Sequence, residues 1–518
     1  MSNFLDDNLN QSVFFDLNYL EVLGNNTFEY CLYQLLENDD IVSDFYARYK
    51  NKSVGRKAYP PALLLRVIFY AYYRGHTSSR VIERLCKTDL KFIALAAGRQ
   101  PHFTTIADFV SSNCEAINRL FHKVLLICDA SGLIGKEHFA IDGCKLPTNA
   151  SKQWSGTHKE LRKKSEKLKL AAKKIIDKHM SNDSDKGRGN KIADDQQQTI
   201  DTLMKNARKI DDFLENNEPR MGQGRRKKEV QSNITDNQSA KMTTSKGTIQ
   251  GVNCVTAADE KHQIIVHAQT FGMGQEQVTL KPMVEGIKSN LGEDVFKPSL
   301  VLTADTGFSS IETMQYLFDE KINAVVPDNQ FRKRNPIFSE SEHYNKHKVL
   351  RKKTRKDKNA RDEVLHSSTF SVSLENQTCI CPSGKEMLFQ GDDFKGARGI
   401  YARFRGKLKD CRECPLQTKC MKNPVKDQGR QVSFLVEEQE KITCLDLMKQ
   451  KIDSHEGRRL YSRRMWTIEP VFGNITSNKR LNRISVRGEV KATAQWLLYC
   501  MIHNIEKLWK NTEIERWA

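Results

Sequence analysis

The stretch His-Phe-Ala-Ile-Asp-Gly, residues 138–143, is a short apolar run that ends in Asp142 and a turn residue. A second stretch, Leu-Val-Leu-Thr-Ala-Asp-Thr-Gly at residues 300–307, repeats the pattern and ends in Asp305. Short apolar runs bounded by turn residues predict buried strands, so each aspartate is expected at the mouth of a strand. An Asp before a Gly is also ordinary turn chemistry, and neither stretch alone identifies a site.

The order of elements around the two aspartates indicates the fold. After the first strand the sequence predicts a hairpin over 248–256 and 263–270, a helix over 280–291, the second strand, a helix over 311–321 and a strand at 324–326. This is the order of a ribonuclease H-like α/β fold, a mixed sheet flanked by helices. In that arrangement the first and fourth strands end side by side, so Asp142 and Asp305 are expected to converge.

Two converging carboxylates suit a hard divalent cation such as Mg²⁺, which prefers oxygen ligands. Two such ions, roughly 4 Å apart, can activate an attacking oxygen and stabilise the leaving one. The chain has 83 Lys and Arg against 64 Asp and Glu, a formal charge of +19. That balance favours a polyanionic partner.

A third acid is harder to select, because the C-terminal region offers Glu456, Glu469 and Glu489. Glu469 precedes Pro470, which is tolerated in a first helical turn, so it is expected at or near a helix start. A glutamate there can equally complement the helix dipole. Spacing alone leaves both interpretations open.

The C-terminal region contains a distinctive set of residues: Tyr461, Arg464, Glu-Pro-Val-Phe-Gly at 469–473, Arg487-Gly488 with Lys491, and His503-Asn504. Together with segments 140–143, 247–253, 303–307 and the region 59–109, this set shows a resemblance to DDE transposases of bacterial insertion sequences. It implies that Asp142, Asp305 and Glu469 hold two Mg²⁺ or Mn²⁺ ions. It also implies cleavage and strand transfer at terminal inverted repeats, double-stranded target DNA, a homodimer in the assembled complex, no small-molecule substrate and a bacterial cytoplasmic location.

The sequence departs from the family pattern in two places. Four residues separate Arg464 from Glu469 where the family usually has three, and Thr476 stands where a Lys is expected. Lys479 or Arg480, about one turn later, is the expected substitute. A catalytically silent DNA-binding derivative and a nuclease of the same fold without strand transfer are therefore kept as alternatives.

Expected DNA contacts come from the signature, from a basic run and from a weak helix-turn-helix pattern near residues 63–85. The basic run covers 346–361, although such runs are often only solvated. The helical pattern fits ordinary core packing equally well. The expected contacts are Tyr461, Arg464, Lys145, Lys479, Arg80, Arg84, Lys352 and Lys353.

The chain is expected to divide into a helical N-terminal DNA-binding domain, 1–130, and a catalytic core, 131–330 and 446–518. Two insertions interrupt this core: a basic helical hairpin within 151–246 and a basic, cysteine-rich segment at 331–445. No signal peptide is expected, and the most apolar stretch, 62–73, is too short for a membrane span.

Five of the 13 cysteines cluster at short spacings in the second insertion. Cys381, Cys411, Cys414 and Cys420 are the first choice for a structural, zinc ribbon-like Zn²⁺ site, with Cys379 as the alternative ligand. A reduced, metal-free cluster is the competing interpretation.

Overall fold

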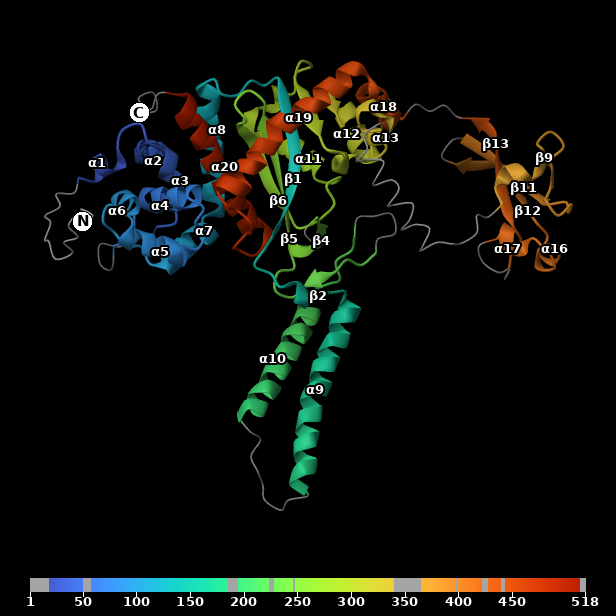
Figure 1. Ribbon diagram of the computed structural model, residues 1–518, viewed down its shortest axis with the longest axis horizontal. Coiled ribbons are helices and arrows are strands. Elements are labelled where there is room, and N and C mark those ends of the chain that lie inside the picture. The colour runs from blue at the N-terminus through green and yellow to red at the C-terminus, as the bar shows by residue number, and fades with distance from the viewer. Residues whose placement is uncertain are drawn as a thin grey trace, which may run out of the picture. The chain divides into compact units, whose positions relative to one another are not determined.

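The computed structural model describes residues 18–49, 57–184, 194–222, 228–245, 247–339, 365–396, 399–421, 427–438 and 443–512 (Figure 1). The chain forms two compact units, residues 1–329 with 454–518, and residues 330–453. Within the described ranges, no helix is long and apolar enough to cross a membrane.

The first unit begins with helices packed around the apolar helix α4. They are α1 (Tyr19–Leu23), α2 (Phe28–Glu37), α3 (Asp39–Tyr46), α4 (Pro61–Tyr73), α5 (Ser79–Thr88), α6 (Leu90–Leu95), α7 (Phe103–Ser112) and α8 (Cys114–Ala130). Pro61 occupies the first turn of α4, where no backbone N–H is needed. Gly75, in the turn after α4, has φ +78, a backbone conformation that favours glycine.

A mixed sheet follows the helices and carries the two aspartates. Its strands are β1 (His138–Pro147), β4 (Ala240–Thr244), β5 (Gly247–Asp259), β6 (Ile265–Phe271), β7 (Val301–Ala304) and β8 (Ala324–Val325). The order is β4-β5-β1-β7-β8, with β6 also paired to β5. β1 is antiparallel to β5 and parallel to β7. The predicted ribonuclease H-like order of strand, hairpin and parallel crossovers is confirmed.

Helices flank this sheet and complete the unit. They are α11 (Leu280–Leu291), α12 (Ile311–Asp319), α19 (His455–Gly473) and α20 (Glu489–Asn511). α19 packs on β1 and β7, and α20 packs on β6 and α8 (Figure 1). A short pair, β2 (Ser155–Gly156) and β3 (Ser232–Asn233), lies at the base of an antiparallel helix pair, α9 (His158–Ser184) and α10 (Asp194–Asn216).

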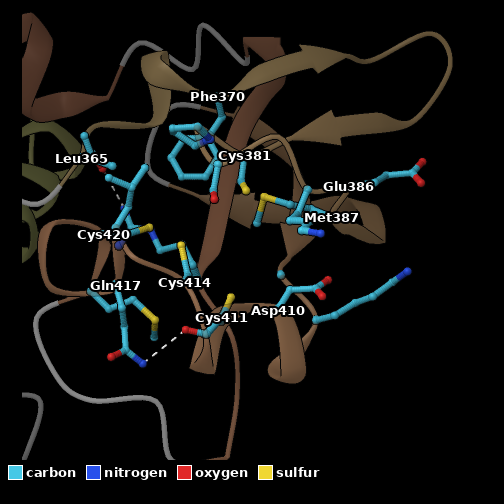
Figure 2. Close-up of a pocket in the computed structure, with 18 residues that line it drawn as sticks. Leu365, Phe370, Cys381, Glu386, Met387, Asp410, Cys411, Cys414, Gln417 and Cys420 are labelled. Atoms are coloured by element: carbon cyan, nitrogen blue, oxygen red, sulfur yellow. Dashed lines mark hydrogen bonds between the residues drawn. The ribbon is translucent and has the colours of Figure 1, made fainter.

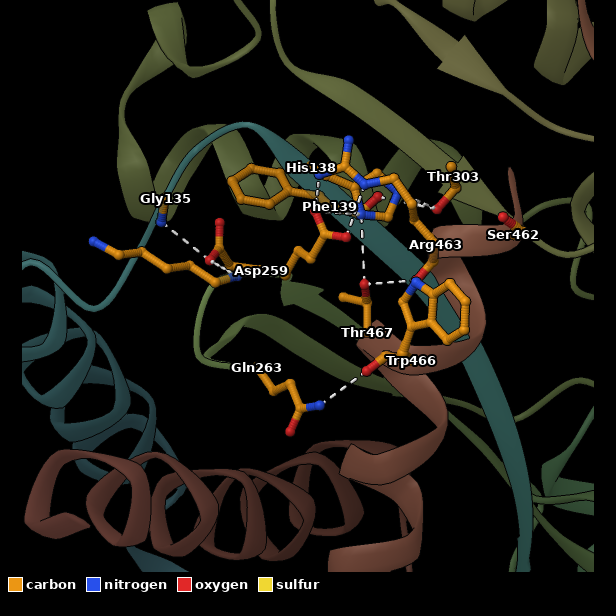
Figure 3. Close-up of polar contacts among 12 residues, drawn as sticks. Gly135, His138, Phe139, Asp259, Gln263, Thr303, Ser462, Arg463, Trp466 and Thr467 are labelled. Carbon is orange, nitrogen blue, oxygen red and sulfur yellow. Dashed lines mark hydrogen bonds and ion pairs between the residues drawn. The ribbon is translucent and has the colours of Figure 1, made fainter. Parts of the chain in front are cut away.

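Two local expectations are wrong. Asp142 lies inside β1 rather than at its end, because the long strand β5 keeps pairing with β1 as far as Pro147. Glu469 lies near the end of α19 rather than at a helix start, because Pro470 is accommodated inside that helix. Proline has no N–H for the carbonyl of Trp466, and the Gln263 side chain donates to that carbonyl at 2.8 Å instead (Figure 3).

The second unit is built around a three-stranded antiparallel sheet. Its strands are β9 (Ser371–Ser373), β10 (Thr378–Ile380), β11 (Leu388–Gly396), β12 (Gly399–Arg405) and β13 (Gln431–Glu438), and its helices are α13 (Phe331–Arg334), α14 (Pro336–Ser339), α16 (Leu408–Arg412), α17 (Gln417–Cys420) and α18 (Cys444–Asp453). The order β11-β12-β13 forms the main sheet, and β9 pairs with β10. Its small core contains Phe370, Cys379, Met387, Ala402, Phe404 and Val432.

Candidate active site

Asp142 and Asp305 are brought together by the parallel pairing of β1 with β7. The last paired residues are Ile141 and Ala304, and the next residue on each chain segment is one of the two aspartates. The side chain of Asp142 is 22% exposed and that of Asp305 is 37% exposed. Backbone hydrogen bonds of the sheet therefore place the two carboxylates beside each other. Both side chains remain partly exposed to solvent.

One face of α19 meets this carboxylate pair. Arg464 Nη1 donates to Asp142 Oδ2 at 2.7 Å, and Arg464 Nη2 lies 3.9 Å from Asp305 Oδ1. Tyr461 Oη donates to Asp305 Oδ1 at 3.1 Å, and the guanidinium carbon of Arg464 lies 5.7 Å from the centre of the tyrosine ring. Residues one helical turn apart thus contact both carboxylates.

Burial and charge act in opposite directions at this site. Burial raises the pKa of Asp142, while Arg464 and the backbone N–H of Gly143 lower it. Burial opposes the charge of Arg464, but the two aspartates outweigh burial and the pKa of Arg464 is raised. Burial, with Asp305 beside it, raises the pKa of Tyr461 to about 12, so the phenol stays neutral and can donate.

Glu469 is not brought to the pair. It is exposed on α19, whereas Arg464, Ile468 and Val471 are buried. Each helical residue turns the chain by about 100°, so Ile468, four residues after Arg464, takes the inward position and Glu469 is rotated away from it. Among the residues that the structure describes, no group of three or more His, Cys, Asp or Glu could hold a metal ion.

The other two acidic candidates also lie elsewhere. Glu456 is exposed in the first turn of α19. Glu489 begins α20, where burial raises its pKa and it accepts a hydrogen bond from the backbone of Gly272. The structure therefore assembles two acids, an arginine and a tyrosine.

A buried polar contact holds α19 on β1 beside the pair (Figure 3). His138 Nε2 lies 3.0 Å from Thr303 Oγ1, and His138 Nδ1 lies 3.5 Å from Thr467 Oγ1. Arg463 Nε donates to Glu260 Oε1 at 2.8 Å. Sequence reasoning missed these positioning residues, since their partners lie on distant segments. Pro470 was a local signal for the Gln263 contact, because it leaves the Trp466 carbonyl without its helical donor.

The remaining predicted DNA contacts fall in different surroundings. Lys145 Nζ, on β1, lies 3.3 Å from Glu276 Oε1. Arg80 and Arg84 are exposed on α5, with the Arg80 guanidinium 4.9 Å from the centre of the Phe103 ring. Lys352 and Lys353 lie outside the described residues.

Lys479 is not placed to contact DNA. Its side chain is 2% exposed, and Nζ donates to Glu506 Oε2 at 2.5 Å and to Asn474 Oδ1 at 3.0 Å. An ion pair with a residue of α20 therefore occupies this lysine. The next residue, Arg480, is exposed.

Four cysteines of the second unit line one cavity of about 40 Å³ (Figure 2). They are the predicted set, Cys381, Cys411, Cys414 and Cys420. Cys379 is excluded from it, because its thiol is buried in the core, 3.7 Å from Met387 Sδ. Burial raises the pKa of Cys420, and the neighbouring thiols add to this. The four thiols face one space without forming a closed metal shell.

Two family models match this chain, at opposite ends. Residues 380–509 match a transposase DDE domain, and residues 18–112 match a transposase domain known as DUF772. No curated protein matches. The cryo-EM structure of a piggyBac transposase synaptic complex with hairpin DNA aligns at 11% identity and a TM-score of 0.31, over 96% of this chain and 79% of that one. Both matched families are transposase families, and the C-terminal match is to a DDE domain, so the chain is similar to DDE transposases in these two regions.

Proposed function

We propose that the site around Asp142 and Asp305 cuts DNA at the terminal inverted repeats of the element that encodes the chain, and joins the freed 3′ hydroxyl to target DNA. The observation that carries this proposal is the pair of aspartates at adjacent positions of parallel strands, both beside Arg464. Because the reaction handles two ends and one target, we propose a homodimer as the working assembly.

DDE transposase domains generally use divalent metal ions. Asp142 and Asp305 offer the carboxylate oxygens that Mg²⁺ or Mn²⁺ prefers, so this donor set fits such an ion. We assign Glu469 as the third ligand on the resemblance. Bound in this site, two ions would activate the attacking oxygen and stabilise the leaving oxygen.

The residues of α19 have separate roles in this proposal. Without DNA, Arg464 neutralises the carboxylate pair, and a divalent ion competes with it for the same oxygens. Once displaced, its planar guanidinium binds a phosphate of the substrate. Tyr461, held neutral by its raised pKa, donates a hydrogen bond at the same place.

Glu469 reaches the pair only if α19 turns about its own axis. The helix has a ready place for such a change, because Pro470 interrupts its hydrogen bonds and residues Asn474–Asn478 form a π-helix directly after it. A π-helical turn is rare and is often found at functional sites. We propose that DNA binding turns this segment so that Glu469 faces the aspartates.

The proposal is tested with purified full-length chain, end DNA and a supercoiled target, with Mg²⁺ or with a chelator. We expect metal-dependent nicking at the end and covalent joint products from pre-cut ends. Asp305→Ala should bind the end DNA and produce neither. Mg²⁺-dependent cleavage by Asp305→Ala would contradict the assignment, and cleavage without joint products would identify a nuclease.

A catalytically silent DNA-binding protein is the second candidate. The specific observations in its favour are Thr476 in place of the family lysine and the outward position of Glu469. Binding to end DNA without cleavage by the unaltered chain, in Mg²⁺ and in Mn²⁺, would establish it.

We also propose that Cys381, Cys411, Cys414 and Cys420 bind one structural Zn²⁺, since four thiolates complete a tetrahedral shell and leave no position for chemistry. The cavity that they share supports this, and zinc would draw the thiols together. Elemental analysis of the full chain should find one zinc per chain, lost in Cys414→Ser and kept in Cys379→Ala. No zinc in the unaltered chain would establish the metal-free cluster, and one zinc retained in Cys414→Ser would exclude Cys414 as a ligand.

A further inference from the structure

We propose that a groove in the first unit binds the phosphate backbone of the DNA on which the carboxylate pair acts. This arginine groove lies between the α4–α5 turn, α7 and the segment 480–486, and has a volume of about 670 Å³. The inference rests on the proposed function, because it names where the same substrate is held. It assigns the contact to Arg480 and Arg483, in place of the buried Lys479.

Charge distinguishes this groove from two other open grooves of the unit. Its lining includes Arg480, Arg483, His76, Ser78 and Ser79, and among the described residues that line it there is no Asp or Glu. A lining of cations and hydroxyl donors without a carboxylate is what a polyanionic backbone requires.

Two other grooves provide the comparison. One, of about 500 Å³, contains Arg48, but Asp108 pairs with that arginine at 3.2 Å. The other, of about 510 Å³, is lined by Glu115 and Glu489. These two grooves of similar size in the same unit thus contain acids that oppose a phosphate, and the described lining of the arginine groove does not.

The two arginines are held differently. Arg480 is exposed, and its aliphatic stem packs at Gly75, where an added Cβ would lie 3.0 Å from Arg480 Cδ. Arg483 Nε donates to the carbonyl of Thr148 at 3.2 Å, and Nη2 donates to Asn149 Oδ1 at 3.1 Å. A guanidinium has five N–H donors, so Arg483 is oriented by these bonds and keeps donors for a phosphate.

The facing wall of the groove is fixed by aromatic packing. Thr77 Oγ1 lies 3.1 Å from Tyr499 Oη, and the Tyr499 ring stacks on Tyr72 with centroids 4.6 Å apart. Burial lowers the pKa of His76, and the positive charges of Arg74 and Arg480 lower it further, which is consistent with a positive potential here. The groove is therefore formed before DNA arrives.

The arginine groove is also tied to the strand that carries Asp142. The backbone N–H of Ile484 donates to the carbonyl of Pro147 at 2.9 Å, at the end of β1. Asp142 is five residues earlier on that strand, about 17 Å along an extended chain. Since base pairs stack about 3.4 Å apart, one duplex could touch both places within about five base pairs.

The test measures binding of fluorescent end DNA by the full chain in an Asp305→Ala background, at several salt concentrations. Arg480→Gln combined with Arg483→Lys should weaken binding about tenfold, and Arg480→Gln alone should lower the slope of log affinity against log salt by about 0.9, the value for one phosphate contact. The control is Arg48→Gln, in the acid-containing groove, which should leave affinity and slope unchanged.

Binding is read without cleavage, so failure of this inference is separable from failure of the proposed function. Folded variants, checked by melting temperature, with unchanged affinity and salt slope would overturn the groove assignment even if the unaltered chain cuts DNA. An equal loss in Arg48→Gln would also overturn it, because it would show a general charge effect. A defect seen with an RNA duplex and absent with DNA would assign the groove to another ligand.

Discussion

The aspartates on strands and the glutamate on helix α19 differ in how the fold positions them. Asp142 and Asp305 follow the last paired residues of two parallel strands, so backbone hydrogen bonds determine their proximity. The direction of Glu469 depends on helix rotation, and one extra residue after Arg464 turns a side chain by about 100°. The strand acids are therefore already in place, whereas Glu469 depends on how α19 is turned.

Substitution of an aspartate on a strand is expected to reduce DNA cleavage the most. Asp142→Asn keeps the shape of the side chain but removes the charge that a divalent ion needs, so cleavage of end DNA should fall by about 10³-fold or more. Asp319→Asn, at the exposed end of α12, is the matched control and should cleave normally. Cleavage by Asp142→Asn within tenfold of the unaltered chain would remove Asp142 from the site.

Substitution of Glu469, the glutamate on α19, should reduce DNA cleavage less. Glu469→Gln is expected to lower cleavage about 10²-fold, because a third ligand stabilises an ion that two aspartates already hold. Glu456→Gln, exposed on the same helix, is the control and should have little effect. If Glu456→Gln lost activity and Glu469→Gln kept it, the third acid would be Glu456, and the comparison between strands and helix would need a different residue.

The sequence was sufficient for the sheet but not for the helix face. Apolar runs and their order predicted β1, the β5–β6 hairpin, β7 and hence the aspartate pair. Three facts depended on distant partners: β5 extends β1 past Asp142, Gln263 supplies the bond that Pro470 cannot, and Glu506 on α20 buries Lys479. Local patterns contain no information about such partners.

Arg464 connects the two kinds of position, because it reaches from the helix to both strand acids. Arg464→Ala leaves two neighbouring, partly buried carboxylates without a countercharge, so the free energy of unfolding should fall by about 2 kcal/mol. Mg²⁺ should then raise the melting temperature of Arg464→Ala more than that of the unaltered chain, since the ion no longer competes with the guanidinium. An equal rise in both proteins would show that the arginine and the ion do not share a site.

The smallest expected effect is a loss of stability at mildly acidic pH, which reports on the contact between α19 and β1. Burial lowers the pKa of His138 from 6.5 to about 4, so the imidazole is neutral in the folded chain, between Thr303, Thr467, Glu260 and Arg463. The lowered pKa means that protons bind the unfolded chain first. The contribution of neutral His138 to the free energy of unfolding is therefore fully present above the pKa of the unfolded chain. It falls as the pH drops toward the pKa of the folded chain, and about 1 kcal/mol is lost at about pH 5.5.

Melting curves between neutral and mildly acidic pH measure this loss. His267 and His503, whose pKa values burial lowers to about 4 and about 3, add losses in the same range. His138→Gln should therefore be less stable at neutral pH, where it lacks the contact to Thr303, yet lose less on acidification. If the melting temperature of His138→Gln fell as steeply with pH as that of the unaltered chain, His138 would already be charged or solvated beneath α19. The helix would then be free to turn without breaking this contact.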